Sequence, residues 1–457
     1  MACPVERLRI YFVTYNVATK FPDPRQDLHQ LLGIAPHDES QSWPDLYFVG
    51  LQEVKSQPQN IVLDYILFED PWTKAFRDVL KKYDYVKIRS QRLQGLVLNA
   101  FCLRKHLTHL RLIEAQYTKT GLGGMWVRRQ CNNGNPSCST NVVYPQGNKG
   151  AVSVRMNAYG VSVCVVNTHL TPHDHLLANR IADYNTIVTD HAFTASFTSR
   201  ILYHDYIFWI GDLNFRLNGE ELTAADIDLL VKKNQLNELL ERDQLMMVMK
   251  EQQAFAELNE SSITFPPTYK YEFESLEFDL KRRPSWTDRI LYKVNAADIY
   301  EDIEIHIEQH SYKSHPNYSV SDHKPVTGEF DIVVRPNVKD HIVEFQDCTV
   351  EENFISYKLQ RDFIPSSGDW IGLFLNEFSS LDDYIIYEYV SRGKPTSVSD
   401  EPHANTERIS YNDSALRLSE MYCLVYVAQR GDLMEILGVS PEFSGPRRSA
   451  EQCVLST

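Results

Sequence analysis

The stretch Trp209-Ile210-Gly211-Asp212-Leu213-Asn214-Phe215-Arg216 decides the fold, because a predicted buried strand ends there in polar residues. Together with residues 206–208 it has the length and the aromatic, β-branched content of a buried strand. If the extended geometry continues, Asp212 and Asn214 project from the same face, where one can accept a proton and the other can orient the group that loses it. The alternative is an Asx turn that closes the strand.

Three other predicted strands end in polar residues in the same way: Asn16 after residues 8–15, Glu53 after residues 45–52, and His169 after residues 161–166. A carboxylate behind a largely apolar run is costly unless it is exposed or binds a metal ion. Asn and Glu oxygens suit a hard cation. The pattern favours a shared polar site, with ordinary turns and exposed strand ends as the alternative.

Length and composition indicate a two-domain globular protein. The chain has 457 residues, of which 43% are hydrophobic and 23% are charged. Its formal net charge of -15 repels polyanions, and no long Lys/Arg run is present. The first residues lack a secretory apolar region, and the eight cysteines are scattered without a CxxC pair. We therefore expect a cytoplasmic protein with reduced thiols.

Three later segments add polar and cationic residues: an aromatic loop over 263–271 with Tyr269 and Lys270, a stretch over 281–291 with Lys281, Arg283 and Asp288, and a stretch over 319–326 with Asp322 and His323. Adjacent side chains of a strand point to opposite faces, so Asp322 and His323 each need a partner of their own. The prediction is that Asp322 reaches a metal ion while Asp288 holds His323.

Helical spacing of apolar residues predicts helices over 71–83 and 172–189, and two amphipathic helices over 223–258. Thr223 is a predicted N-cap, because Asp226 follows three residues later. These helices carry no predicted chemistry and are assigned to packing against the sheets.

Eight motifs occur in the order seen in inositol polyphosphate 5-phosphatases: Asn16, Gly50-Leu51-Gln52-Glu53, Gly147-Asn148-Lys149-Gly150, Asn167-Thr168-His169-Leu170, Gly211 to Arg216, Phe265 to Tyr271, Pro284 to Leu291, and Ser321 to Val326. The chain thus resembles these magnesium-dependent members of the endonuclease, exonuclease and phosphatase superfamily. The resemblance implies a catalytic domain over residues 1–335, with an α/β fold built as a four-layer sandwich. The strand ends would meet in one cleft.

The resemblance also implies roles for the matching residues. Asn16, Glu53 and Asp322 resemble the Mg²⁺ ligands. Asp212, oriented with Asn214, resembles the group that activates the attacking water. His169 and His323 resemble the groups that bind the scissile phosphate, with Asp288 favouring the charged form of His323.

The implied substrate-binding residues are Asn148, Lys149, Tyr269, Lys270, Lys281 and Arg283. The last four match positions that grip a 4-phosphate next to the reacting group, a use that suits clustered cations beside a catalytic acid. The alternative is a solvated positive loop.

Residues 127–146 interrupt a glycine-rich motif, because without them Met125-Trp126 would run directly into Gly147. One hypothesis is a retained short intron, since Val-Arg can be encoded with a GT donor and the final Val-Val-Tyr-Pro-Gln with a pyrimidine tract closed by CAG. The rival is a genuine loop insertion. In both cases the polar composition predicts a disordered excursion.

A second domain is predicted over 338–438, followed by a flexible tail over 439–457. Short strands at regular intervals, separated by turns, predict an all-β immunoglobulin-like sandwich. Tyr357, the stretch Gly368-Asp369-Trp370-Ile371-Gly372 and Tyr422 resemble a SKICH domain. That resemblance implies targeting to a membrane or to a protein partner.

The leading hypothesis is Mg²⁺-dependent removal of the 5-phosphate from phosphatidylinositol 4,5-bisphosphate and phosphatidylinositol 3,4,5-trisphosphate, with soluble inositol polyphosphates as further substrates. The protein would be cytoplasmic and recruited to the plasma membrane or the endoplasmic reticulum. The alternative is a SKICH-bearing scaffold whose catalysis is impaired by residues 127–146. The net negative charge of the chain disfavours a nuclease. The predicted substrate-binding cations also match a single phosphate next to the reacting one, and not a nucleic-acid backbone.

Overall fold

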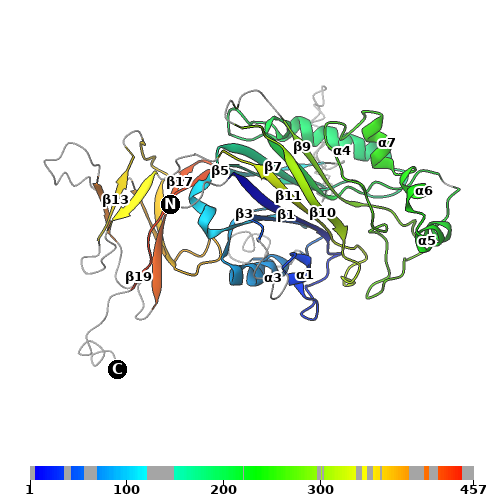
Figure 1. Ribbon diagram of the computed structural model, residues 1–457, viewed down its shortest axis with the longest axis horizontal. Helices are drawn as coiled ribbons and strands as arrows, with labels where there is room; N and C mark the ends of the chain where they lie inside the picture. The colour runs from blue at the N-terminus through cyan, green and yellow to red at the C-terminus, as the bar shows by residue number, and fades with distance from the viewer. Residues whose placement is uncertain are drawn as a thin grey trace, which may run out of the picture.

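The structure is a computed structural model that describes residues 6–34, 43–55, 69–120, 149–219, 221–295, 300, 303–335, 342–346, 354–360, 363–390, 406–410 and 420–444. Two β-sheets packed face to face form its larger part, and a smaller β-sandwich adjoins them at one end (Figure 1).

The first sheet has six strands in the order β10-β11-β1-β2-β4-β3. Their bounds are β1 (Arg7–Asn16), β2 (Leu46–Gln52), β3 (Tyr85–Leu93), β4 (Leu96–Leu103), β10 (Ile307–Ser314) and β11 (Val326–Val333). The facing sheet contains β5 (Leu110–Lys119), β6 (Gly150–Ala158), β7 (Val161–His169), β8 (Tyr206–Asp212) and β9 (Asp288–Val294), paired in that order.

Each central strand buries both of its faces, which explains the near-continuous apolar runs in the sequence. In β1, Phe12 points between the sheets, where its ring centroid lies 4.5 Å from that of Phe208. Tyr15 of the same strand points outward and packs edge-on against Trp72. The sandwich therefore has a core between its sheets and a further core on each outer face.

Helices cover the two outer faces and complete the four layers (Figure 1). One outer face carries α1 (Leu28–Leu31) and α3 (Pro71–Leu80), and the other carries α4 (Leu177–Asp190) and α7 (Gln244–Lys250). The helices α5 (Ala224–Lys232) and α6 (Leu236–Leu240) lie at one end of the sandwich, where their buried residues join the core between the sheets. The 3-10 turns are η1 (Lys81–Tyr83), η2 (Arg104–His109) and η3 (Ile201–Tyr203). The Asp70 carboxylate begins α3 by accepting the Trp72 and Thr73 amides at 3.1 and 3.0 Å, and Thr223 and Asp226 form the capping box of α5.

Two helix predictions need correction. The predicted helix over 172–189 begins at Leu177, because the Arg180 guanidinium binds the His173 carbonyl at 2.6 Å and holds the preceding residues as a loop. The region over 223–258 contains three short helices where two are predicted.

The smaller part of the chain is an all-β sandwich. One layer is β12 (Val343–Gln346), β13 (Phe354–Leu359) and β16 (Thr406–Ser410), and the other is β14 (Trp370–Leu375), β15 (Ile386–Tyr389), β17 (Met421–Arg430), β18 (Leu433–Val439) and β19 (Phe443–Ser444). The prediction of a flexible tail from residue 439 is wrong for residues 439–444, because Val439 ends β18 and β19 pairs with β17. Residues 445–457 lie outside the described residues.

The C-terminal sandwich docks onto edge strands of both catalytic sheets. Met434 of β18 pairs with Ile113 of β5, and Leu381 and Ser379 exchange backbone hydrogen bonds with Lys87 of β3 at 3.1 and 2.8 Å. Ile113 lies toward the end of β5 where Leu110 pairs with Ala158. The docking contact with β5 therefore lies away from the end of the sheet where β7 terminates.

Replacing Arg104 by Ala should loosen this docking. The Arg104 guanidinium lies 4.3 Å from the Phe378 ring centroid and donates to the Phe378 carbonyl at 2.6 Å. Losing these contacts is expected to reduce the free energy of unfolding by about 1–2 kcal/mol. Urea denaturation of the full chain measures this, with Lys74→Ala on the exposed face of α3 as the control. An unchanged free energy would show that the contact does not stabilise the protein.

Two buried histidines should make stability fall in acid. Burial lowers the pKa of His191 to about 4 and that of His204 to about 3. Because the unfolded state protonates first, their contribution is complete above about pH 6.5 and is lost as the pH falls toward those values. Each histidine should cost up to about 2 kcal/mol at pH 5 relative to pH 7. Urea titrations at both pH values test this, and His191→Gln should show the smaller pH effect.

Candidate active site

The polar ends of four strands meet at one edge of the sandwich. β1 and β2 run parallel with Asn16 opposite Gln52, and β7 and β8 run parallel with His169 opposite Asp212. The Asn16 amide donates across the two sheets to Asp212 Oδ2 at 2.9 Å, and on its own sheet's side to Glu53 Oε1 at 3.4 Å. Asn16, Glu53, His169 and Asp212 are thus brought together from distant parts of the chain.

Asp212 lies at the centre of this group and is 1% exposed. Its Oδ2 atom is 3.4 Å from His169 Nε2 and 3.9 Å from His323 Nε2, while its Oδ1 atom accepts the Asn214 backbone N–H at 3.1 Å. Burial raises the pKa of Asp212 to about 6, although the charge of His323 opposes the shift. A carboxylate with this pKa can accept a proton near neutral pH.

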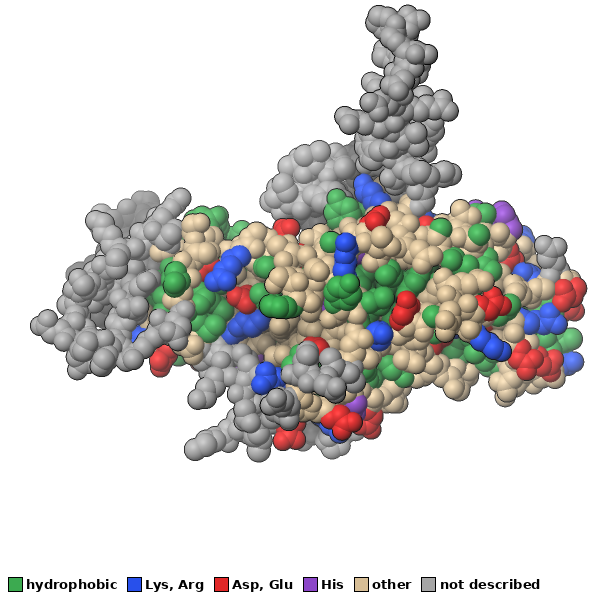
Figure 2. Space-filling view, turned by 90° about the horizontal axis from the view of Figure 1, so that it is seen from above, with side chains coloured by type: hydrophobic (Ala, Val, Ile, Leu, Met, Phe, Trp, Pro, Cys, Tyr) green, Lys and Arg blue, Asp and Glu red, His purple; other side chains and the backbone are tan. Residues whose placement is uncertain are grey.

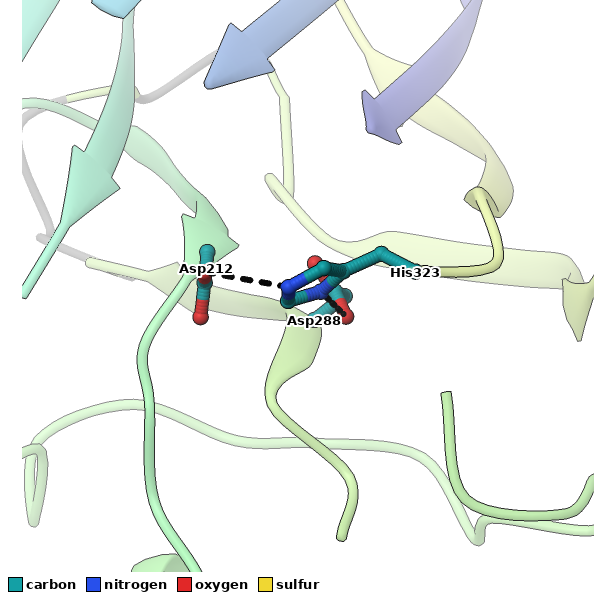
Figure 3. Close-up of side chains that lie close together, drawn as sticks. All are labelled: Asp212, Asp288 and His323. Atoms are coloured by element: carbon teal, nitrogen blue, oxygen red, sulfur yellow. Dashed lines mark hydrogen bonds and ion pairs between the residues drawn. The ribbon is translucent and has the colours of Figure 1, made fainter. Parts of the chain in front are cut away.

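Asp288 and His323 form the second half of the centre, and Figure 3 shows both beside Asp212. His323 Nδ1 lies 2.9 Å from Asp288 Oδ2, which also accepts the hydroxyls of Thr268 and Thr287 at 2.7 and 2.8 Å. Burial alone would lower the pKa of His323, but the carboxylates of Asp288 and Asp212 outweigh it and raise the pKa to about 9. His323 is therefore an imidazolium at neutral pH.

His169 is instead neutral, because burial and the nearby cations Lys149 and His323 hold its pKa well below the usual value. The Lys149 ammonium lies 2.6 Å from His169 Nε2 and donates to it. Burial also lowers the pKa of Lys149. At this position the cationic group is Lys149, with neutral His169 as its acceptor.

Asn214 does not continue the strand as the extended-geometry interpretation requires. Its φ of 57° lies in the left-handed region, so the residues after Asp212 form the Asx turn that was the alternative. The Asn214 side chain donates to the Leu170 carbonyl at 3.1 Å and accepts from Arg216. Asn214 therefore orients Asp212 through its backbone N–H, because its side chain is engaged elsewhere.

Arg216, at the end of the stretch that follows β8, is a site residue that was not predicted from the sequence. The Arg216 guanidinium lies 4.5 Å from the Tyr269 ring centroid, and the Tyr269 ring lies 4.4 Å from that of His323. Arg216 is 7% exposed. The available signal was an arginine two residues beyond Asn214, directly after Phe215. Nothing in the sequence marked Thr268 or Thr287 as partners of Asp288.

The predicted substrate-binding cations occupy different settings. Lys270 is partly exposed and pairs with Asp279 at 3.0 Å, and Lys281 is exposed. Arg283 instead binds Asp174 Oδ2 at 3.0 Å and the Leu217 carbonyl at 2.8 Å. The prediction that Arg283 grips a substrate phosphate is not supported, because these loop contacts already use its guanidinium. Asn148 lies outside the described residues, as does the predicted insertion over 127–146.

The site offers oxygen ligands that fit a divalent cation. The Glu53 side chain is 38% exposed, so its carboxylate is accessible to a ligand. Within the described part of the chain, the buried Asp288 Oδ1 atom has no hydrogen-bond partner. Ligand atoms of Asp212, Asp288 and His323 lie within 4.8 Å of one another, a described cluster that does not include Asp322. Asp322 is partly buried, and its backbone carbonyl accepts the Tyr271 N–H at 2.9 Å.

Comparison with known proteins agrees with this geometry. The family model "Endonuclease/Exonuclease/phosphatase family 2" matches residues 13–329, and the model "SKICH domain" matches residues 341–445. The chain is 33% identical to mouse (Mus musculus) inositol polyphosphate 5-phosphatase K over 97% of its own length and 90% of that protein. It is also 33% identical to human (Homo sapiens) phosphatidylinositol 4,5-bisphosphate 5-phosphatase A, over 89% of this chain but 39% of that protein.

Solved structures give the same fold. The 5-phosphatase domain of SPsynaptojanin, in complex with inositol (1,4)-bisphosphate and calcium, matches with a TM-score of 0.56 and 28% identity over 72% of this chain and 85% of that chain. A mutant nitrophorin from Cimex, in its ferrous NO complex, matches with a TM-score of 0.54 and 25% identity over 72% of this chain and all of that chain.

The predicted fold class is confirmed, since the α/β catalytic sandwich is followed by an all-β SKICH region. The fold is shared with a nitrophorin, so the polar strand ends carry the functional assignment. Its motifs, its match to a relative over nearly the whole chain and its two matching family models show that this chain belongs to the inositol polyphosphate 5-phosphatases of the endonuclease/exonuclease/phosphatase family.

Proposed function

We propose that this phosphatase removes the 5-phosphate from phosphatidylinositol 4,5-bisphosphate and phosphatidylinositol 3,4,5-trisphosphate in a Mg²⁺-dependent reaction, with soluble inositol polyphosphates as further substrates. The observation that carries the proposal is the contact between Asn16 and Asp212, at 2.9 Å across the two sheets. It places Asn16, whose amide oxygen can bind a hard cation, beside a buried carboxylate whose pKa is raised to about 6. The name of the human relative also supports this substrate class.

Asp212 is the proposed proton acceptor for the attacking water. Its two oxygens are fixed by the Asn16 amide and the Asn214 backbone N–H, so the carboxylate has a defined orientation. In-line attack on phosphorus then needs positive charge around the equatorial oxygens. We assign that charge to the His323 imidazolium and the Lys149 ammonium, which flank Asp212.

Glu53 and the Asn16 amide oxygen are the proposed holders of Mg²⁺, with Asp322 as a third ligand. Bound there, the ion would polarise the phosphoryl oxygens and stabilise the leaving inositol oxygen. Asp288 takes no direct part in the proton transfer of this scheme. It holds the Nδ1 side of His323 and leaves Nε2 directed toward Asp212, as Figure 3 shows.

The neighbouring 4-phosphate is assigned to Tyr269, Lys270 and Lys281. Lys270 precedes a loop whose Phe273, Leu276 and Leu280 side chains are exposed by 46%, 61% and 49%. Apolar side chains next to cations suit a substrate that lies in an anionic lipid surface. The loop supports a lipid substrate, and with it recruitment of a cytoplasmic protein to the plasma membrane or the endoplasmic reticulum.

We propose that membrane or protein partners bind through the SKICH domain and that nucleic acid is not a substrate. Among the described side chains on the face in Figure 2, Lys and Arg lie singly among acidic groups without forming a continuous basic stripe. In the described part of the chain, no helix is both long enough and apolar enough to span a bilayer.

Phosphate release separates this function from its alternatives. Vesicles containing phosphatidylinositol 4,5-bisphosphate should yield phosphate with Mg²⁺, whereas duplex DNA should stay intact. The same assay on a chain lacking residues 127–146 tests the scaffold alternative. Turnover that appears only after that deletion would show that the full chain is impaired, and cleavage of DNA without lipid turnover would contradict the proposal.

A further inference from the structure

Two buried amides connect the catalytic sheets directly behind the active site. Gln52 lies at the end of β2 and Asn167 lies in β7, and both are fully buried. The Gln52 Nε2 atom donates to Asn167 Oδ1 at 2.7 Å and to Thr14 Oγ1 at 3.1 Å. The Asn167 Nδ2 atom donates to the carbonyls of Val97 and Leu51 at 2.7 and 3.2 Å. Asn167 of one sheet is therefore bound to three residues of the other.

These contacts are unusual for their position, because the space between the sheets is otherwise filled by a large apolar cluster. A buried amide is tolerated when it is hydrogen-bonded, and its bonds have strict distances. Apolar contacts accept small shifts of one sheet against the other, whereas this amide pair specifies one spacing and one register.

Gly50 gives independent evidence that the spacing is constrained. A Cβ atom added at Gly50 would lie 2.8 Å from Asn167 Cγ and 2.7 Å from Ile210 Cδ1. Both distances are shorter than ordinary carbon contacts, so the sheets could not approach this closely with a larger residue. The glycine and the amide pair thus meet at the same point between the sheets.

The residues that follow this point belong to the active site. Glu53 comes directly after Gln52, and His169 comes two residues after Asn167 on the same face of β7. The cross-sheet distance from His169 Nε2 to Glu53 Oε1 is 3.9 Å. A shift between Gln52 and Asn167 would change this distance directly.

We propose that Gln52 and Asn167 are positioning residues that set the separation between the metal-binding side and the phosphate-binding side of the active site. The inference rests on the proposed function, because that function assigns Glu53 to the metal ion and assigns Lys149, which donates to His169, to the phosphate. Neither amide touches the reacting atoms. They act through the strands that carry Glu53 and His169.

The test uses the full chain with Gln52→Met, Asn167→Leu and the double variant. Each single change leaves an amide unpaired and should lower Tm, whereas the double variant replaces both partners by apolar groups and should regain part of the loss. We expect the double variant to keep kcat about 10- to 100-fold below the wild type, with KM nearly unchanged. The Mg²⁺ concentration for half-maximal thermal stabilisation should rise by a similar factor.

Asn99→Leu is the matched control, because Asn99 is a fully buried amide of β4 that bonds to Thr73 Oγ1 at 2.8 Å on the outer side of the first sheet. It should lower Tm without changing kcat or the Mg²⁺ requirement. A double variant with wild-type kcat and Mg²⁺ response would overturn the inference, whatever its Tm. A wild-type chain that binds Mg²⁺ but does not release phosphate would instead contradict the proposed function, and the Mg²⁺ titration would still test the positioning role.

Discussion

Replacing Asp212 by Asn is expected to lower kcat for phosphatidylinositol 4,5-bisphosphate by about 10²- to 10⁴-fold. Asparagine keeps the size of the side chain but cannot accept a proton. The wild-type carboxylate is suited to this task, because burial raises its pKa to about 6 while the Asn16 amide and the Asn214 N–H fix its orientation. Since the variant keeps the groups that hold the substrate, KM should change little.

Steady-state phosphate release from vesicles measures this effect, and circular dichroism and Tm show whether the variant is folded. Asp190→Asn, at the exposed end of α4, is the matched control and should retain the wild-type kcat. A kcat near the wild-type value for Asp212→Asn would remove Asp212 from the role of proton acceptor.

Replacing His323 by Asn should lower kcat by about 10²- to 10³-fold, because it removes the positive charge that is positioned to stabilise the phosphate oxygens. Asp288 and Asp212 keep this imidazole protonated by raising its pKa to about 9. Asp288→Asn should act in the same direction with a smaller effect, since it leaves the ring in place but removes the charge 2.9 Å from Nδ1.

The double variant of His323 and Asp288 distinguishes a shared role from two separate roles. If Asp288 acts through His323, the double variant should be about as slow as His323→Asn alone. Additive losses would show that Asp288 has an independent function. His306→Asn, an exposed histidine outside the site, is the control.

The sequence predicted which residues stand at strand ends. The apolar runs before Asn16, Glu53 and Asp212 each mark a buried strand, and the polar residue after such a run has to lie at its end. The pairing of β1 with β2 and of β7 with β8 then places those ends at one edge. Which sheet faces which, and hence the contact of Asn16 with Asp212, came from the structure.

Several site features depend on contacts that no local pattern encodes. Arg283 belongs to a cationic run, yet its guanidinium is taken by Asp174, which is 109 residues away in the chain. Asn214 adopts a left-handed backbone conformation, which turns its side chain toward Leu170. Gln52 forms part of a recognised motif, but its pairing with Asn167 becomes visible when the two sheets are packed together.

The most direct test of the proposed function is a Mg²⁺ titration of phosphatidylinositol 4,5-bisphosphate hydrolysis by the full chain, with the lipid product identified by mass spectrometry and chromatography. We expect phosphatidylinositol 4-phosphate, formed when Mg²⁺ is supplied and lost when a chelator removes it. Formation of phosphatidylinositol 5-phosphate, or turnover that persists without any divalent cation, would contradict it.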